Sequence, residues 1–477
     1  MLLSIQQNAA IVNTILAISS ALLLTHWVVA RLTSAKSPKG CRKLGLMHRQ
    51  SNLNDEYDPK YADGVSEQST DEQGRPAWRV KALFTYPIKS CAGVELNTAD
   101  VVSTGLEFDR QFCFAEKVTS TPASQKDPSY SGGNLERTSW VARTLRNSGF
   151  SKLALIRPEI WVPDPTIQGY SPDFEEARSR GVMVIYYPHF SRNALHFLYL
   201  KLMVHLRIIP SEASFCIPLF PAPEKEKSYA LTPVRLWKDS PIAYDYGKHI
   251  PDSFHRFFAQ PGPGTEKRRE SGRITLFRVK PLNHRVIFRN APKKEVLGFQ
   301  PATGFADAYP IHLLSLSSVR NVAAHCASSI SSLSIRRFRA NIIIQGPAAF
   351  VEDEWKRIRI GPSSSSCISS SSNCKPIGQH EDKSTGTIIH TVCRTIRCKL
   401  PNVDPDTGIR HPHEPDQTLR SYRVIDPGEK TYACLGMQGV PAAQEFRIRV
   451  GDPISVLETG DHFYIKMLAP GEVVEGV

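Results

Sequence analysis

The chain has 477 residues, 41% hydrophobic and 22% charged, with a formal net charge of +13. This length and composition suit a globular protein with a large core and two domains, and the positive charge favours anionic ligands, anionic membrane surfaces or acidic partner proteins. Nucleic acid is not an expected partner, because the sequence has no zinc-finger spacing, Walker loop or GxGxxG motif between a strand and a helix.

The first predicted element is a membrane anchor at residues 1–31. The first 30 residues contain no Asp, Glu, Lys or Arg, and 11–30 is an apolar stretch about long enough to cross a bilayer as a helix. Five cations follow from Arg31 to Lys43, an order that indicates a signal anchor with the rest of the chain in the cytosol rather than a cleaved signal peptide. An interfacial helix is the alternative, since polar side chains interrupt the stretch.

A flexible linker is predicted at 32–77, where large apolar side chains are few. From residue 78 the pattern changes to short strands separated by proline and glycine, as at 80–86 and 94–96. We therefore expect a strand-rich domain over 78–260.

An unusual segment at 186–235 interrupts this domain. Its apolar run at 196–206 contains a lysine and two histidines, so a second membrane span is not expected there. Two readings stay open, a lineage-specific insertion and an artefact of the gene prediction.

A second domain is predicted at 274–460. Apolar spacing indicates a helix at 311–324, and three consecutive isoleucines indicate a buried strand at 340–345. The Ser-rich insertion at 362–385 is of low complexity and is expected to form a surface loop. Ahead of this domain, a short helix is expected near 252–258.

The strongest chemical signal is Cys398, which lies between Arg397 and Lys399. Neighbouring positive charge stabilises a thiolate, the form that acts as a nucleophile or as a soft metal ligand. A structural cysteine is the alternative, because Ile396 and Leu400 would share the face of a strand with Cys398. These residues alone leave both readings open.

The ten cysteines include no CxxC pair and no regular spacing, which argues against a disulfide framework or a structural zinc site and favours a reducing compartment. The DPDTG segment at 404–408 predicts a tight turn, and its two carboxylates are too few for a calcium loop.

Six segments, taken in order, resemble MOSC domains of the mitochondrial amidoxime-reducing component type. The resemblance covers roughly 79–458, with insertions, and implies a β-rich α+β fold in which an N-terminal β-barrel domain precedes a MOSC β-barrel-like domain. The segments are YPIKSCAGVEL (86–96), FDRQF (108–112), FADAYPIHLLSLSSV (305–319), RRFRANIIIQG (336–346), IRCKLPNVDPDTG (396–408) with EPDQTLRSYRVIDP (414–427), and VGDPISVLE (450–458).

The resemblance also implies a cofactor. Cys398 would be the catalytic residue and would ligate molybdenum in a molybdenum-molybdopterin cofactor (Moco). Each further candidate, taken alone, is better explained as a solvated surface group, but all except Arg146 belong to the ordered motifs. Arg146, in the segment TLR (144–146), is a weaker match because the sequence after it is rearranged. The residues expected to bind the cofactor are Lys89, Ser90, Arg110, Arg146, Asp307, Arg339, Asn341 and Arg397.

Three residues, in two motifs, depart from the family pattern. The family often has Asp-Thr-Ser where this chain has Asp307, Ala308 and Tyr309, and Ile396 replaces a small polar residue found in some relatives. These changes bear on substrate preference more than on cofactor binding.

The resemblance implies a membrane-anchored oxidoreductase of the mitochondrial outer membrane, facing the cytosol, that reduces N-hydroxylated compounds such as amidoximes and hydroxylamines. Its electrons would come from cytochrome b5 and an NADH-dependent flavin reductase, because the chain has no flavin or nicotinamide motif of its own. Two alternatives stay open. One is sulfur transfer to the cofactor, although nothing upstream of residue 79 is long enough for a pyridoxal-phosphate sulfurase domain. The other is a non-catalytic cofactor carrier.

Overall fold

The computed structural model describes residues 37–47, 50–120, 137–191, 193–263, 273–362 and 386–466, together with scattered helical positions between 13 and 28. Most of the predicted anchor at 1–31 and nearly all of the Ser-rich insertion at 362–385 lie outside the described residues. Within the part of the chain that is described, no helix is both long enough and apolar enough to cross a membrane.

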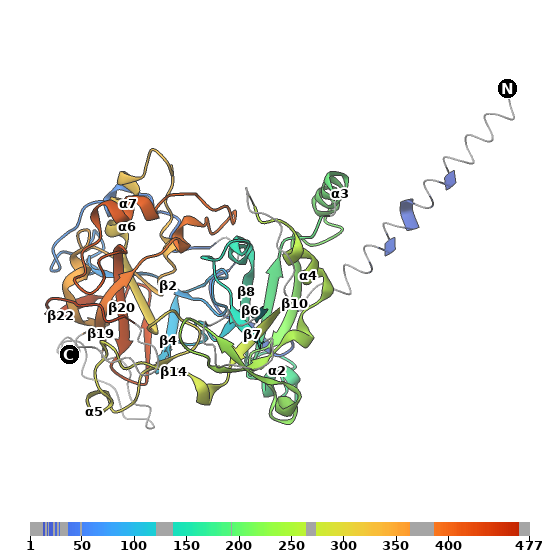
Figure 1. The fold of residues 1–477 in the computed structure, drawn as a ribbon, viewed down its shortest axis with the longest axis horizontal. Coiled ribbons are helices and arrows are strands. Elements are labelled where there is room, and N and C mark those ends of the chain that lie inside the picture. Colours follow the sequence, from blue (N-terminus) through green and yellow to red (C-terminus); the bar gives the residue numbers. More distant parts are fainter. Residues whose placement is uncertain are drawn as a thin grey trace, which may run out of the picture.

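An eight-stranded sheet forms one half of the molecule (Figure 1). Its strand order is β22-β18-β19-β20-β16-β17-β2-β3; β16 and β17 pair in parallel, and β19 pairs antiparallel with β18 and β20. In chain order the strands are β2 (Arg79–Thr85), β3 (Val94–Leu96), β16 (Ile311–Ser315), β17 (Ile342–Gln345), β18 (Trp355–Ile360), β19 (Thr387–Ile396), β20 (Cys434–Pro441) and β22 (Ile454–Thr459).

Two helices, α6 (Leu316–His325) and α7 (Asp416–Tyr422), cover one face of this sheet. Leu316, Val319 and Val322 of α6 recur every three residues and are buried against apolar side chains of β2 and β17. The predicted helix at 311–324 is therefore partly wrong, because its first five residues form β16. Continuous apolar sequence fits a fully buried strand as well as a helix.

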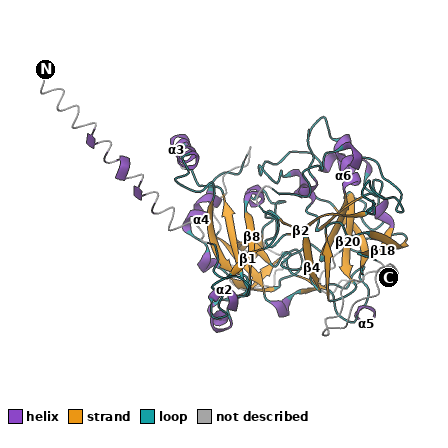
Figure 2. Ribbon diagram, turned by 180° about the vertical axis from the view of Figure 1, so that it is seen from behind, coloured by secondary structure: helices purple, strands orange, loops and turns teal. Residues whose placement is uncertain are grey.

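A closed barrel forms the second half, with the strand order β11-β12-β13-β6-β7. Figure 2 shows this half beside the eight-stranded sheet. The barrel strands are β6 (Phe112–Ser120), β7 (Arg137–Ala142), β11 (Leu231–Arg235), β12 (Ile242–Asp245) and β13 (Ile274–Val279). The predicted β-rich fold with an N-terminal barrel is confirmed.

A four-stranded sheet lies against the barrel, in the order β1-β8-β9-β10. It consists of β1 (Cys41–Lys43), β8 (Arg157–Pro163), β9 (Val182–Tyr187) and β10 (Ala213–Pro218). The smaller elements are β4 (Thr98–Val102), β5 (Gly105–Leu106) and β21 (Glu445–Arg449), which pair together; β14 (Arg285–Val286) and β15 (Ala302–Thr303); and helices α2 (Glu175–Arg178), α3 (Ala194–His205), α4 (Asp252–Ala259) and α5 (Lys294–Leu297).

Helix α4 joins the barrel to the four-stranded sheet. Its three phenylalanines have i, i+3, i+4 spacing and share one buried face. The ring of Phe254 stacks on Phe114 of β6, with ring centroids 5.2 Å apart, and meets Tyr187 of β9 edge-on at 5.0 Å. This aromatic contact holds the two sheets together.

The predicted flexible linker at 32–77 is wrong wherever the structure describes it. β1 is an edge strand of the four-stranded sheet, and Leu53 is buried in the cluster around α6. The carboxylate of Glu56 accepts a hydrogen bond from Ile335 N at 2.9 Å. Single buried apolar side chains and buried hydrogen bonds hold this segment against the body. Neither kind of contact produces a periodic sequence pattern.

The sheets do not follow the expected division into domains at 78–260 and 274–460. β2 and β3 belong to the eight-stranded sheet with the C-terminal strands, whereas β13 belongs to the barrel. The unusual segment at 186–235 supplies β10 and β11 to the body, and α3 lies in the connection between β9 and β10. The chain thus crosses between the two halves, and its connections line the space at their junction.

Candidate functional site

One cavity, of about 480 Å³, is lined by all nine residues that the sequence analysis selected. Five connections contribute to it. Lys89 follows β2, Arg110 follows β5, Arg146 follows β7, Asp307 precedes β16 and Cys398 follows β19. Residues scattered over most of the chain therefore meet at one site.

The wall of this cavity is strongly cationic. Among its described lining residues the only carboxylate is Asp307, so the site suits an anionic ligand such as a phosphate. The lining cations are Lys89, Arg110, Arg146, Lys238, Arg289, Arg339, Arg394 and Arg397.

The buried Lys89 is held by two oxygens. Its Nζ donates to Phe305 O at 2.8 Å and lies 2.5 Å from Asp307 Oδ1. Burial lowers the pKa of Lys89, and the Asp307 charge opposes that shift. The adjacent Lys89 charge holds the pKa of the Asp307 carboxyl, which is 57% exposed, at about 2. Ser90, next in sequence, accepts a hydrogen bond from Leu145 N at 3.3 Å.

Asn341 positions Arg110. Its Oδ1 accepts hydrogen bonds from Arg110 Nη1 at 3.0 Å and from His312 N at 3.1 Å. Its Nδ2 donates to Phe84 O at 3.1 Å and to Asp109 Oδ1 at 2.9 Å. These four bonds use the full capacity of an amide side chain. Asn341 thus acts through Arg110 rather than by offering a free polar atom to a ligand.

Arg339 has one nitrogen without a partner. Its guanidinium lies over the ring of Tyr86, 4.3 Å from the centroid, and its Nη1 donates to Cys91 O at 2.5 Å. Its Nη2 is buried and makes no hydrogen bond. Burial lowers the pKa of Arg339 to about 10. An unpaired buried donor costs free energy that a bound acceptor would recover.

Four residues of the cavity wall have left-handed backbone conformations. They are Ser90, Arg110, Trp237 and Arg339, with φ between 48° and 68°. Non-glycine residues rarely adopt this conformation, and such strained positions concentrate at functional sites. The strain supports the assignment of this cavity as the functional site.

Cys398 lies just beyond the end of β19, but its neighbours do not act as predicted. The Arg397 guanidinium turns away to donate to Leu435 O at 2.9 Å and to Phe338 O at 3.2 Å, and Lys399 is exposed. Burial raises the pKa of the Cys398 thiol, and Arg397 offsets only part of that shift. Flanking cations alone therefore do not produce a thiolate here, whereas coordination to a metal would.

The sequence analysis missed several residues of the wall. Trp237 also lines the cavity. Its ring centroid lies 4.8 Å from the Arg146 guanidinium, and the indole Nε1 donates to Asp307 Oδ1 at 3.3 Å. No sequence signal marked Trp237. Arg394 lies near the end of β19, where the pairing with β20 is irregular between Arg394 and Ile396, so strand alternation could not have placed it in the wall beside Cys398.

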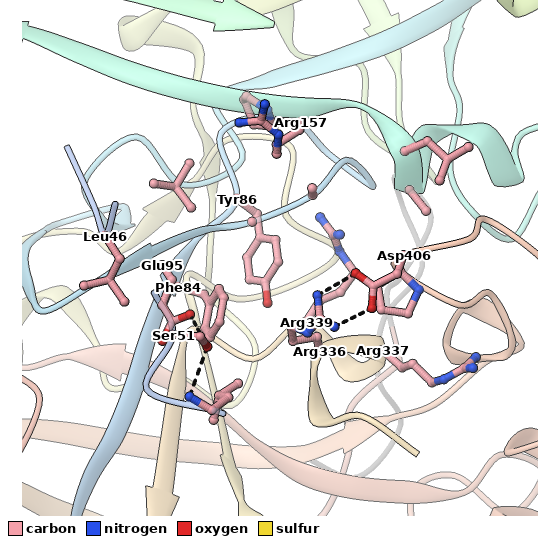
Figure 3. Close-up of a pocket in the computed structure, with 18 of the residues that line it drawn as sticks. Leu46, Ser51, Phe84, Tyr86, Glu95, Arg157, Arg336, Arg337, Arg339 and Asp406 are labelled. Carbon is pink, nitrogen blue, oxygen red and sulfur yellow. Dashed lines mark hydrogen bonds and ion pairs between the residues drawn. The ribbon is translucent and has the colours of Figure 1, made fainter. Parts of the chain in front are cut away.

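A larger cavity, of about 740 Å³, lies beside the first and shares Arg339 with it. Figure 3 shows the ring of Tyr86 between Glu95 on one side and Arg336 on the other. Most of its charged groups are paired, since Arg336 binds Asp406 at 2.8 and 2.5 Å and Lys43 binds Glu159 at 2.7 Å. The smaller cavity is the better candidate, because it combines a thiol with an excess of cations.

The residues of the smaller cavity fit a phosphate-bearing organic group that carries a soft metal. Three of them have buried polar atoms without a hydrogen-bond partner, namely Arg339 Nη2, Arg394 Nε and Thr395 Oγ1. The cations suit the phosphate, and a single thiol suits a soft metal whose other ligands come from the organic group.

Comparison with known proteins identifies two family domains in the chain. The chain matches the MOSC domain over residues 300–455 and the MOSC N-terminal beta barrel domain over residues 77–131. The resemblance inferred from the six ordered segments is confirmed.

The curated relatives are amidoxime-reducing components. The chain is 31% identical to mitochondrial amidoxime-reducing component 1 of Mus musculus over 167 residues, 34% of this chain and 41% of that protein. It is 31% identical to mitochondrial amidoxime reducing component 2 of Rattus norvegicus over 153 residues, 31% of this chain and 37% of that protein. The chain is 30% identical to mitochondrial amidoxime-reducing component 1 of Homo sapiens over 156 residues, which are 32% of this chain and 38% of that protein. The match spans about two fifths of the length of these relatives.

Proposed function

We propose that this chain is an oxidoreductase, from its match to the MOSC domain and, ahead of that, to the MOSC N-terminal beta barrel domain. It would hold a molybdenum-molybdopterin cofactor and reduce N-hydroxylated compounds. The observation that carries the proposal is the convergence of Cys398 and eight further candidate residues on one cationic cavity. The names of the relatives, amidoxime-reducing components, supply the reaction class.

Within the cavity, the cations hold the anionic part of the cofactor. Lys89 and Arg110 are buried or nearly so and are fixed by Asp307, Asp109 and Asn341. Their positions are therefore set before the ligand arrives, which limits the conformational entropy lost on binding. Arg339 adds the unpaired Nη2 as a donor.

Cys398 would be the one protein ligand of the metal. When bound, the cofactor would supply a metal centre that passes electrons in pairs to the substrate. The N–O bond of a hydroxylamine breaks as the substrate takes up two electrons and two protons, and the products are the amine and water. The raised pKa of the free Cys398 thiol means that metal binding displaces a proton from it.

The electrons would come from cytochrome b5, kept reduced by an NADH-dependent flavin reductase. One NADH supplies the two electrons of each turnover, and the cytochrome passes them one at a time. A net charge of +13 suits an acidic protein partner.

We further propose that residues 1–31 anchor the protein in the mitochondrial outer membrane, with the body in the cytosol. The uncharged first 30 residues and the cations that follow support this orientation. Deletion of 1–36 keeps β1 and should release the protein from membranes. A truncated protein that stays with the membranes through a carbonate wash would rule the anchor out.

The test of the cofactor assignment is the molybdenum and pterin content of the purified full chain, compared with that of Cys398→Ala. The proposal requires about one molybdenum for each native chain and its loss in the variant. Absence of molybdenum from a native chain made in cells that assemble the cofactor would refute it.

A further inference from the structure

The connection between β9 and β10 carries a helix that the proposed chemistry does not use. Helix α3 projects from the body in Figures 1 and 2. Large apolar side chains are exposed along it, and a water-soluble surface rarely leaves such side chains contiguous unless they meet a partner.

Four exposed leucines form one stripe, and Phe197, which is 52% exposed, lies on another side of the helix. Leu195, Leu198, Leu202 and Leu206 recur at i, i+3, i+7 and i+11, so they lie on the same face of the helix. Their exposed fractions are 79%, 65%, 50% and 54%. Leucines that recur in this way normally face the protein core, and those of α3 face solvent.

The opposite face of α3 packs on the chain that follows the helix. Leu200 and Met203 are buried in a small cluster with Ile209, and every member of that cluster lies between residues 199 and 209. Beyond the helix, β9 and β10 pair regularly from Tyr187 and Ala213 onward. The helix is thus an appendage on a regular hairpin, and its leucine stripe contributes nothing to the core of the body.

The charge around the stripe points to an anionic lipid surface. No Asp or Glu occurs from residue 177 to residue 211, whereas Lys201 and Arg207 are cations of the appendage. Lys201 Nζ lies over the ring of Phe197, 4.8 Å from its centroid. Exposed leucines and an exposed aromatic ring, with cations and no acidic side chain beside them, suit shallow insertion into an anionic membrane interface.

We infer that α3 inserts its leucine stripe into the surface of an anionic bilayer. The contact is shallow, since a helix of 12 residues is too short to span the hydrocarbon core. It uses residues outside the anchor proposed at 1–31, so the two contacts can be tested separately. Together the two contacts would fix how the cationic cavity faces the membrane.

The test uses the full chain and vesicles of phosphatidylcholine, with or without phosphatidylserine, whose acyl chains carry bromine. A genetically encoded fluorescent amino acid replaces Leu198 in one protein and Val296 of α5 in the other. Val296 is the matched control, because it is 71% exposed on a helix at the opposite end of the molecule (Figure 1). Flotation with the vesicles reports the anchor separately.

Bromine should quench the reporter at 198 by about twofold in phosphatidylserine vesicles, and it should leave the reporter at 296 unchanged. Leu195→Gln with Leu202→Gln should abolish the quenching and leave flotation unaltered. Equal quenching of the reporters at 198 and 296, with the protein still floating with the vesicles, would overturn the inference. The proposed anchor would be unaffected by that result. The inference would also be overturned if, without lipid, the fluorescence of the reporter at 198 changed with protein concentration. That result would indicate that a second copy of the chain covers the leucine stripe.

Discussion

The Nζ of Lys89 lies 2.5 Å from Oδ1 of Asp307, and this ion pair ties the connection after β2 to the segment before β16. The two partners differ in exposure, since the side chain of Lys89 is 5% exposed and that of Asp307 is 57% exposed. The lysine therefore depends on its partner more than the aspartate does, because an unpaired charge is costly only where water is excluded.

We expect the variant of this pair that loses more stability to lose less cofactor, and the other variant to do the reverse. Asp307→Asn leaves a buried ammonium without its counter-charge and should lower the free energy of unfolding by about 1–3 kcal/mol, whereas Lys89→Met should cost under about 1 kcal/mol. Lys89→Met should lose more pterin, by about tenfold. Denaturant unfolding and pterin analysis of both variants measure these two losses. Equal pterin loss would show that Lys89 does not contact the cofactor.

Arg339 and Arg336 offer a matched pair for testing the cavity wall. Arg339→Lys keeps a charge but loses the planar fork that reaches Cys91 O and stacks on Tyr86, so we expect at least about a tenfold loss of cofactor affinity. Arg336→Lys changes a partly exposed pair with Asp406 and should alter affinity by less than about twofold. Binding of the isolated cofactor to apoprotein gives both values. Similar losses of cofactor affinity in the two variants would mean that Arg339 supports the fold and does not contact the cofactor.

The two cysteines of this region should respond in opposite ways. Cys398→Ala should abolish molybdenum binding and change the free energy of unfolding by less than about 0.5 kcal/mol, because Cys398 is only half-buried. Cys393→Ala should cost about 1–2 kcal/mol, since Cys393 is fully buried beside Tyr309. Its molybdenum content for each folded chain should stay at the native level. Metal loss in both variants would instead indicate that the two cysteines support one structure.

Glu352 makes stability depend on pH. Burial raises the pKa of this carboxyl to about 7, and the charge of Asp353 adds to that shift. The folded state then binds more protons than the unfolded state between about pH 4.5 and 7, so stability falls as pH rises through this window. Glu352→Gln should gain on the order of 2 kcal/mol over the native protein at pH 8 and almost nothing at pH 4.5.

Denaturant unfolding at the two pH values measures this difference. Glu458→Gln is the control, because that carboxyl is 56% exposed and should show no such dependence. If the gain of Glu352→Gln is the same at both pH values, the carboxyl is not protonated in the folded state.

The ordered motifs located the cavity wall because each one carries its residue at a fixed place in a short connection. They could not predict what each side chain does there. Asn341 is saturated by contacts with Arg110, His312, Phe84 and Asp109, and these depend on the assembled fold.

The packing of the segment before β2 could not be predicted from the sequence, for a similar reason. Its contact from Glu56 to Ile335 joins positions 279 residues apart, and no local pattern records such a pair. Periodicity predicts elements that bury a regular face, as in α4, and it misses segments that are held by single contacts.

The central claim is that this chain passes electrons from an external donor to an N–O bond at a metal held by Cys398. The direct measurement is NADH oxidation by the full chain, loaded with cofactor and mixed with cytochrome b5 and its flavin reductase. The account predicts oxidation only when a hydroxylamine or amidoxime is present, with one amine or amidine formed for each NADH, and at least about a hundredfold loss in Cys398→Ala. A molybdenum-replete protein that consumes no NADH with any of several N-hydroxylated compounds would contradict the account and favour a cofactor carrier.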